Sequence, residues 1–122
     1  MASKKILVVD DEPGFIQLVG EYLTSMGYDV STAANPKEAV VLFKKHRPRV
    51  VLLDFNMPFL TGEKFLPVLQ TIEPTVRAIV ISGCVEEEVE EKFRGLGYFA
   101  FFEKGSLSLE KLKNKVDEAL NY

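Results

Sequence analysis

Short apolar runs and longer apolar stripes at helical spacing alternate along the whole of this sequence. Short runs between polar boundaries are typical of strands, and apolar residues three and four apart are typical of helices. The pattern predicts five strands, at Lys5–Val9, Asp29–Ala33, Val50–Leu53, Ala78–Ile81 and Tyr98–Phe102. A helix is expected after each strand: Pro13–Met26, Asn35 to near Lys45, about ten residues after Thr61, a stripe of Val85, Val89, Phe93 and Leu96, and one starting near Ser108.

Strict alternation of strand and helix with short connections requires parallel strands joined by right-handed crossovers. The predicted fold is therefore α/β: a flavodoxin-like (βα)5 doubly wound parallel sheet with the strand order 2-1-3-4-5. A length of 122 residues suits a single domain, spanning 1–122, with one well-buried core.

The third predicted strand carries the most informative residue. Val50 to Leu53 are four apolar residues in a row, which predicts a strand buried on both faces in the middle of the sheet. Asp54 follows at the carboxyl end of this strand, where open α/β sheets bind their ligands. A carboxylate in that place is positioned for chemistry.

Polar residues end three other strands at the same edge of the sheet. Asp10 and Asp11 follow the first strand, Ser82 follows the fourth and Lys104 follows the fifth. The first and third strands are neighbours in the predicted order. Asp10, Asp11 and Asp54 are therefore expected to converge on one crevice.

Three gathered carboxylates predict a metal ion. Two of them about 5 Å apart, at an effective dielectric constant near 20, repel by roughly 3 kcal/mol. Mg²⁺, which binds through carboxylates, a carbonyl and retained waters, would remove this repulsion. Asp11 is the expected direct ligand together with Asp54, Asp10 is expected to act through water, and the backbone carbonyl of Asn56 could complete the set.

A carboxylate beside a metal, a hydroxyl and an ammonium suits phosphoryl transfer. Asp54 is the expected nucleophile, and its product would be an aspartyl phosphate. Lys104, the Ser82 hydroxyl and loop N–H groups would stabilise the oxygens of the transferred group.

At these residues the chain resembles the receiver domain of bacterial two-component response regulators, over essentially its whole length. The motifs that carry the likeness are VVDDEP, LLDFNMPFLTG, VISG and FFEK. The resemblance implies that a histidine kinase phosphorylates Asp54 with Mg²⁺. It also implies that Ser82 and Phe101 move together as a switch that changes the face of the fourth helix, fifth strand and fifth helix. The family usually has proline after its lysine, whereas this chain has Gly105.

Charge and hydropathy bound the partners. A net charge of -3 and a pI near 5.2 argue against direct nucleic-acid binding, for which a basic patch is expected. We expect a sensor histidine kinase or phosphotransfer protein to dock on the first helix, and a downstream protein target, or an output domain missing from this chain, on the switch face. No apolar run approaches the roughly 20 residues that span a bilayer, and the first strand is too short for a secretory signal. A cytoplasmic location without membrane contact is expected.

Three other functions stay open from the sequence. A metal-dependent phosphohydrolase would also use an aspartate nucleophile, but Asn56 stands where such an enzyme commonly has its general acid. A flavin- or nucleotide-binding module would need a phosphate-binding loop where Asp10, Asp11 and Glu12 stand. The third is a receiver-like module that is not phosphorylated and only binds partners, which Gly105 keeps possible.

Overall fold

The computed structural model describes residues 4–57 and 60–121. Pro58 and Phe59, which belong to the LLDFNMPFLTG motif, lie outside the described residues. The chain forms a five-stranded parallel sheet in the order β2-β1-β3-β4-β5, which confirms the predicted topology. The strands are β1 Lys5–Val9, β2 Asp29–Ala33, β3 Val50–Asp54, β4 Arg77–Ser82 and β5 Ala100–Glu103.

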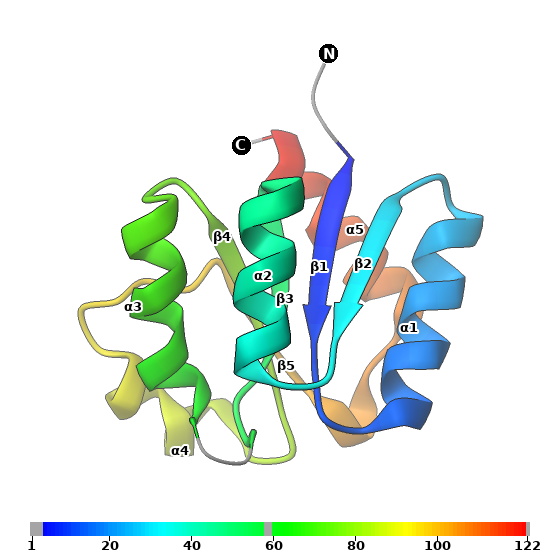
Figure 1. Cartoon of the computed structure of the whole chain (residues 1–122). Helices are drawn as coiled ribbons and strands as arrows, with labels where there is room; N and C mark the ends of the chain where they lie inside the picture. Colours follow the sequence, from blue (N-terminus) through cyan, green and yellow to red (C-terminus); the bar gives the residue numbers. More distant parts are fainter. Residues whose placement is uncertain (1–3, 58–59, 122) are drawn as a thin grey trace.

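The helices cover both faces of this sheet (Figure 1). Figure 1 shows α2 and α3 on one face and α1 and α5 on the other. The α-helices are α1 Pro13–Ser25, α2 Pro36–His46, α3 Gly62–Ile72, α4 Glu86–Val89 and α5 Leu109–Asn121, with 3-10 turns at η1 Glu90–Phe93 and η2 Lys104–Ser106. None of them, within the part of the chain that the structure describes, is long and apolar enough to cross a membrane.

Alternate residues of the central strands pack into two separate hydrophobic cores, one on each face of the sheet. All five residues of β3 are buried, which confirms the predicted burial of the apolar run Val50 to Leu53 and adds Asp54. Val51 and Leu53 pack with α2 and α3 residues such as Phe43 and Phe65, whereas Val50 and Leu52 pack in the cluster on the α1 and α5 side. Successive side chains of a strand point to opposite faces, so both layers of helices are anchored on the same strand.

Local sequence signals set several helix ends. The Asn35 side chain accepts a hydrogen bond from the backbone N–H of Glu38 at 2.8 Å, and Pro36 follows as the first residue of α2. Gly27, just beyond α1, has a φ of 95°, which glycine adopts without strain. Pro67 lies inside α3, past its first turn.

The fourth helix is shorter than its apolar stripe predicted. The α-helical part spans only Glu86–Val89, and η1 follows; Leu96 lies outside the helix. Glutamates three and four residues apart repel one another on a helix. Gly95 and Gly97 have φ values of 81° and 71°, which end any helical continuation. Val89 and Phe93 are buried as predicted.

The fifth strand is displaced by two residues from its predicted start, because Ala100 rather than Tyr98 begins it. Tyr98 instead turns its hydroxyl to Glu86, at 2.5 Å from Oε2, and its ring packs against Phe93 with 5.5 Å between centroids. A tertiary contact with α4 and η1 therefore replaces the strand pairing that the apolar run predicted.

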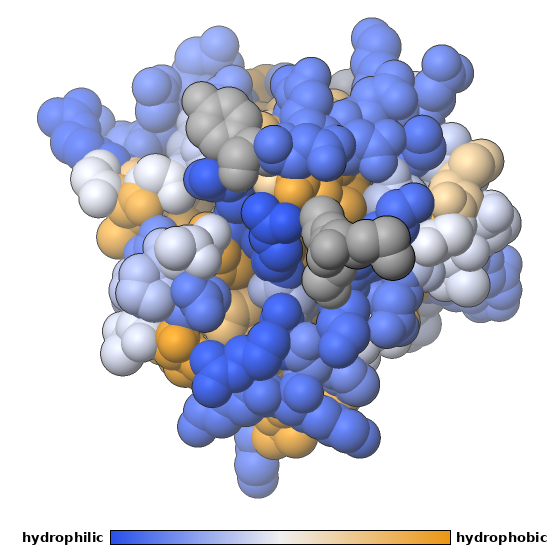
Figure 2. Space-filling model, turned by 90° about the horizontal axis from the view of Figure 1, so that it is seen from above, coloured by the Kyte–Doolittle hydropathy of each residue, from blue (hydrophilic) through white to orange (hydrophobic). Residues whose placement is uncertain are grey.

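Figure 2 shows the molecule from the edge at which the strands begin. This face is covered mostly by hydrophilic side chains, with smaller hydrophobic areas between them. The residues predicted to form a site lie at the other edge, where the strands end, at the lower side of Figure 1.

Candidate functional site

The carboxyl ends of β1 and β3 bring three acids together. Val9 of β1 pairs with Leu53 of β3, so the residues that follow, Asp10 and Asp54, lie side by side. One carboxylate oxygen from each of Asp10, Asp11 and Asp54 lies within 4.8 Å of the others. The predicted convergence of these acids is confirmed.

The three acids differ in exposure. Asp10 is 1% exposed and Asp54 is 4% exposed, whereas Asp11 is exposed. Backbone N–H groups two residues further along the chain donate to both buried acids: Glu12 N–H to Asp10 Oδ1 at 2.9 Å, and Asn56 N–H to Asp54 Oδ1 at 3.3 Å. These local hydrogen bonds hold one oxygen of each carboxylate and leave the other for a further partner.

Lys104 supplies the cation of the pocket. It follows β5 and begins the turn η2. Its Nζ lies 2.8 Å from Asp10 Oδ2, 2.6 Å from Glu12 Oε1 and 3.9 Å from Asp54 Oδ2. Burial lowers the pKa of the Lys104 ammonium, but the carboxylates of Asp10, Glu12 and Asp54 outweigh this and raise it above its ordinary value. The group is therefore a permanent positive charge.

The Asp54 carboxylate is held at a cost. Burial raises its pKa from 3.8 to about 6, and the negative charge of Asp10 adds to the rise. The Lys104 ammonium and the Asn56 N–H offset part of it. Asp54 is thus a poorly solvated anion, which gains from any cation or bond that takes up its charge.

Ser82 ends β4 next to the pocket, and Phe101 lies within β5. Asp54 pairs with Ile81, so Ser82 is the next residue along the neighbouring strand, and its side chain is fully buried. Ser82 Oγ accepts a hydrogen bond from the Cys84 N–H at 3.0 Å. Phe101 pairs with Val80 and is half-buried against the core and Tyr98. The hydroxyl of Ser82 has its own proton left to donate.

The donor set fits a hard divalent cation. The three acids offer oxygen ligands, which Mg²⁺ prefers, and Asp10 Oδ2 is buried without a hydrogen bond among the described residues; the Lys104 ammonium contacts it only outside hydrogen-bond geometry. Asn56 is exposed beside Asp54. The arrangement is an acidic triad able to hold a cation beside the Asp54 carboxylate.

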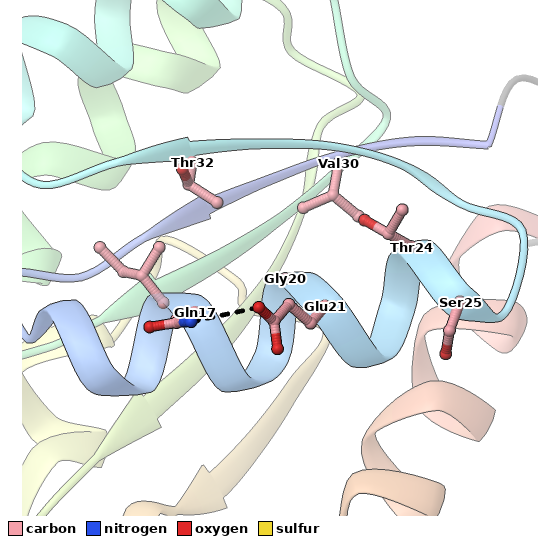
Figure 3. A pocket seen from close by; sticks show the side chains of 8 residues that line it. Gln17, Gly20, Glu21, Thr24, Ser25, Val30 and Thr32 are labelled. Carbon is pink, nitrogen blue, oxygen red and sulfur yellow. Dashed lines mark hydrogen bonds between the residues drawn. The ribbon is translucent and has the colours of Figure 1, made fainter.

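A separate groove lies between α1 and β2 (Figure 3). It measures about 470 Å³ and is lined mainly by apolar and uncharged groups, with Gly20 facing Thr32 across it. Its one lining carboxylate, Glu21, accepts a hydrogen bond from the Gln17 amide at 3.2 Å. None of the acids of the pocket at Asp54 lines it.

The sequence prediction missed two neighbours of Lys104. Glu12 makes the shortest ion pair with the ammonium, and the Phe15 ring centroid lies 4.6 Å from Nζ. The signal in the sequence is the third consecutive acid after β1, which by itself indicates only a charge unfavourable to a phosphate ligand.

A parallel α/β sheet with an acidic triad, a lysine and a serine at its carboxyl edge is the architecture of a CheY-like receiver. The family model described as "Response regulator receiver domain" matches residues 6–117. The chain therefore belongs to the response regulator receiver domain family. It is a phosphoacceptor module of two-component signalling, and its role is regulatory rather than that of an enzyme with an external substrate.

Individual relatives agree with this assignment. The chain is 30% identical over 120 residues to "Sporulation initiation phosphotransferase F" of Bacillus subtilis (strain 168), covering 98% of this chain and 96% of that protein. Several longer transcriptional regulators also match, and the chain spans only 25% to 39% of their length.

Solved structures have the same fold. The chemotaxis protein CheY4 of Vibrio cholerae superposes with a TM-score of 0.88 at 27% identity, covering 98% of this chain and 100% of that one. A receiver domain protein of Clostridium thermocellum gives a TM-score of 0.87 at 28% identity, covering 96% and 94%.

Proposed function

We propose that Asp54 is the phosphoryl acceptor of this receiver. The observation that carries the proposal is the position of Asp54: it ends the central strand β3 beside Asp10 and Asp11, it is buried with a pKa raised to about 6, and it lies 3.9 Å from the Lys104 ammonium. A carboxylate oxygen of Asp54 would attack the phosphorus of a phosphohistidine, form a P–O bond and release the imidazole as the P–N bond breaks. Hydrolysis of the acyl phosphate by water would return the carboxylate and free phosphate.

In this proposal Asp10, Asp11, Asp54 and the Asn56 carbonyl hold Mg²⁺. Bound there, the ion would supply positive charge for the oxygens of the transferred group. Lys104 would contact one phosphoryl oxygen through its ammonium and Ser82 another through its hydroxyl. Asp54 ends β3, Ser82 ends β4 and Lys104 directly follows β5. Because these strands are neighbours in the sheet, the protein needs no large motion to bring the three residues together.

The proposed donor is a sensor histidine kinase or a phosphotransfer protein. One relative named above is itself a phosphotransferase by name and matches over nearly the whole length of both chains, which supports a place in a phosphorelay. We infer that the donor docks on α1, the helix that begins beside Asp10 and Asp11, and that the protein acts in the cytoplasm, where a kinase has ATP.

We propose that residues 1–122 act as one receiver domain that signals through protein contacts. The output surface would be formed by α4, β5 and α5. Ser82 and Phe101 would move together after phosphorylation and so change the shape of this surface. Its partner would be a downstream protein target or an output domain on a longer form of the chain.

Phosphorylation with acetyl phosphate tests the acceptor. Intact mass spectrometry should show one added phosphoryl group on the wild type in Mg²⁺, no addition in EDTA, and none on Asp54→Asn. The added group should be removed by hydroxylamine, because an acyl phosphate reacts with this nucleophile. Equal mass gain in both proteins would refute the assignment, and no gain in either would favour a module that binds partners without phosphorylation.

A further inference from the structure

The Lys104 ammonium is drawn toward the segment between β1 and α1. Its two shortest contacts are Glu12 Oε1 at 2.6 Å and Asp10 Oδ2 at 2.8 Å, and Asp54 Oδ2 is more than 1 Å further away. The Phe15 ring lies on the same side, with its centroid 4.6 Å from Nζ. The distance of 3.9 Å from Nζ to Asp54 Oδ2 is longer than a hydrogen bond. The ammonium therefore does not hydrogen-bond to the carboxylate that we propose as phosphoryl acceptor.

The Glu12 side chain contacts Lys104 instead of capping its own helix. It occupies the N-cap position of α1, yet its side chain makes no capping hydrogen bond. Its carboxylate instead accepts a hydrogen bond from Lys104, which lies 92 residues further along the chain.

Lys104 stands in the short turn η2, and its side chain is 15% exposed. Gly105 follows it, and an added Cβ at this glycine would meet nothing within 4 Å. The groups described around the ammonium are Glu12, Asp10, the Phe15 ring and, further away, Asp54.

We propose that Glu12 is a positioning residue that holds the Lys104 ammonium away from Asp54 and competes with the phosphoryl group for this cation. The inference rests on the proposed function, in which Lys104 contacts a phosphoryl oxygen. The Nζ lies at ion-pair distance from Glu12 and Asp10, and moving it toward Asp54 lengthens at least one of these two contacts.

The exposure of the two side chains decides which contact, with Asp10 or with Glu12, the ammonium gives up. The Asp10 side chain is 1% exposed and needs a cationic partner, Lys104 or the proposed Mg²⁺, because a buried carboxylate without one is costly. The Glu12 side chain is 65% exposed and can return to water at little cost. Glu12 therefore tunes the affinity of the pocket for a phosphoryl group without blocking it.

Binding of beryllofluoride, which mimics the phosphoryl group, measures this competition. In saturating Mg²⁺, titration followed by ¹⁹F NMR should show that Glu12→Gln binds beryllofluoride about twofold to fivefold more tightly than the wild type, the range expected for an exposed ion pair. Glu12→Ala should behave alike, because it also removes the charge. Glu103→Gln is the matched control: this exposed acid precedes Lys104 and is not among the ion-pair partners described for it, so its affinity should stay at the wild-type value.

A double-mutant cycle with Lys104→Met separates the inference from the function beneath it. Lys104→Met should weaken beryllofluoride binding, and adding Glu12→Gln to it should then give no gain. If Lys104→Met leaves the affinity unchanged, the proposed role of Lys104 fails. If Lys104→Met weakens binding but the gain from Glu12→Gln is absent in the wild-type background, or persists without Lys104, Glu12 does not act through the lysine and the inference is overturned. A gain from Glu12→Gln that persists without Lys104 would mean that Glu12 acts on Mg²⁺ binding or repels the beryllofluoride anion directly.

Discussion

At the scale of single residues, the pocket is a set of charges that the fold tolerates at a cost. Asp54 is nearly fully buried beside Asp10, and only one lysine and one backbone N–H offset this in the described structure. A buried acid whose pKa is raised binds its proton more tightly in the folded than in the unfolded chain. Folding stability is therefore linked to pH through this residue.

Stability of the metal-free protein should fall as pH rises through the titration of Asp54. With a pKa of about 6 in the fold against 3.8 ordinarily, the penalty is absent below pH 4, grows between pH 4 and 6, and levels off above that at roughly 2–3 kcal/mol. Asp54→Asn lacks the penalty, so its free energy of unfolding should exceed that of the wild type near pH 7 and match it near pH 4.

Urea unfolding in EDTA at a series of pH values measures this difference. Asp29→Asn, which alters an exposed acid at the start of β2, serves as control and should keep the pH profile of the wild type. A wild-type minus Asp54→Asn difference that does not change with pH would contradict the linkage.

At the scale of elements, the site depends on how closely α3 approaches the end of β3. Gly62 begins α3, donates its N–H to the Phe55 carbonyl at 2.9 Å and is buried. A Cβ there would lie 3.2 Å from Phe55 Cα and 3.3 Å from the Asp54 carbonyl oxygen. Backbone atoms of the strand that carries Asp54 cannot move aside easily, so the lack of a side chain is what permits this packing.

Replacing Gly62 by alanine should lower the free energy of unfolding by about 1–3 kcal/mol, the usual cost of overpacking. Gly14→Ala is the matched control in α1, where an added Cβ meets nothing within 4 Å and helix propensity favours alanine by up to about 1 kcal/mol. Chemical denaturation of both variants checks the pair. A Gly62→Ala protein as stable as the wild type would show that β3 and α3 adjust freely.

Elements also show where the sequence was insufficient. The stripe of Val89 and Phe93 predicted a buried face correctly, but not that the α-helix ends at Val89. The spacing of apolar residues contains no information on repulsion among neighbouring glutamates or on the hydrogen bond from Tyr98 to Glu86. A pattern records which residues are buried more reliably than which hydrogen bonds the backbone makes.

At the scale of the whole molecule, the sheet gathers like charge at one edge. The β1 and β3 ends carry three acids in one pocket while apolar side chains fill both faces behind it. Lys104 offsets part of this charge, and the oxygens of the three acids are close enough together to hold a cation of higher charge. Ligand binding at the pocket should therefore stabilise the entire domain.

Magnesium should raise the free energy of unfolding of the wild type, by about 1.4 kcal/mol at a free concentration of ten times the dissociation constant. The gain should be smaller in Asp11→Asn and in Asp54→Asn, which each remove one ligand. Thermal or urea unfolding with Mg²⁺ against NaCl of equal ionic strength separates binding from screening. An equal gain from both salts would mean that no specific cation site exists.

The sequence by itself determined the order of strands and helices, the two-sided burial of β3 and the edge at which Asp10, Asp11, Asp54, Ser82 and Lys104 meet. These follow from local periodicity and from the fact that parallel strands end on one side. Only the tertiary structure decided where the Lys104 ammonium lies, since Glu12, Asp10 and Phe15 hold it across long separations in the chain. A periodicity extends over a few residues, whereas the balance of charges in a buried pocket is set by every segment that packs around it.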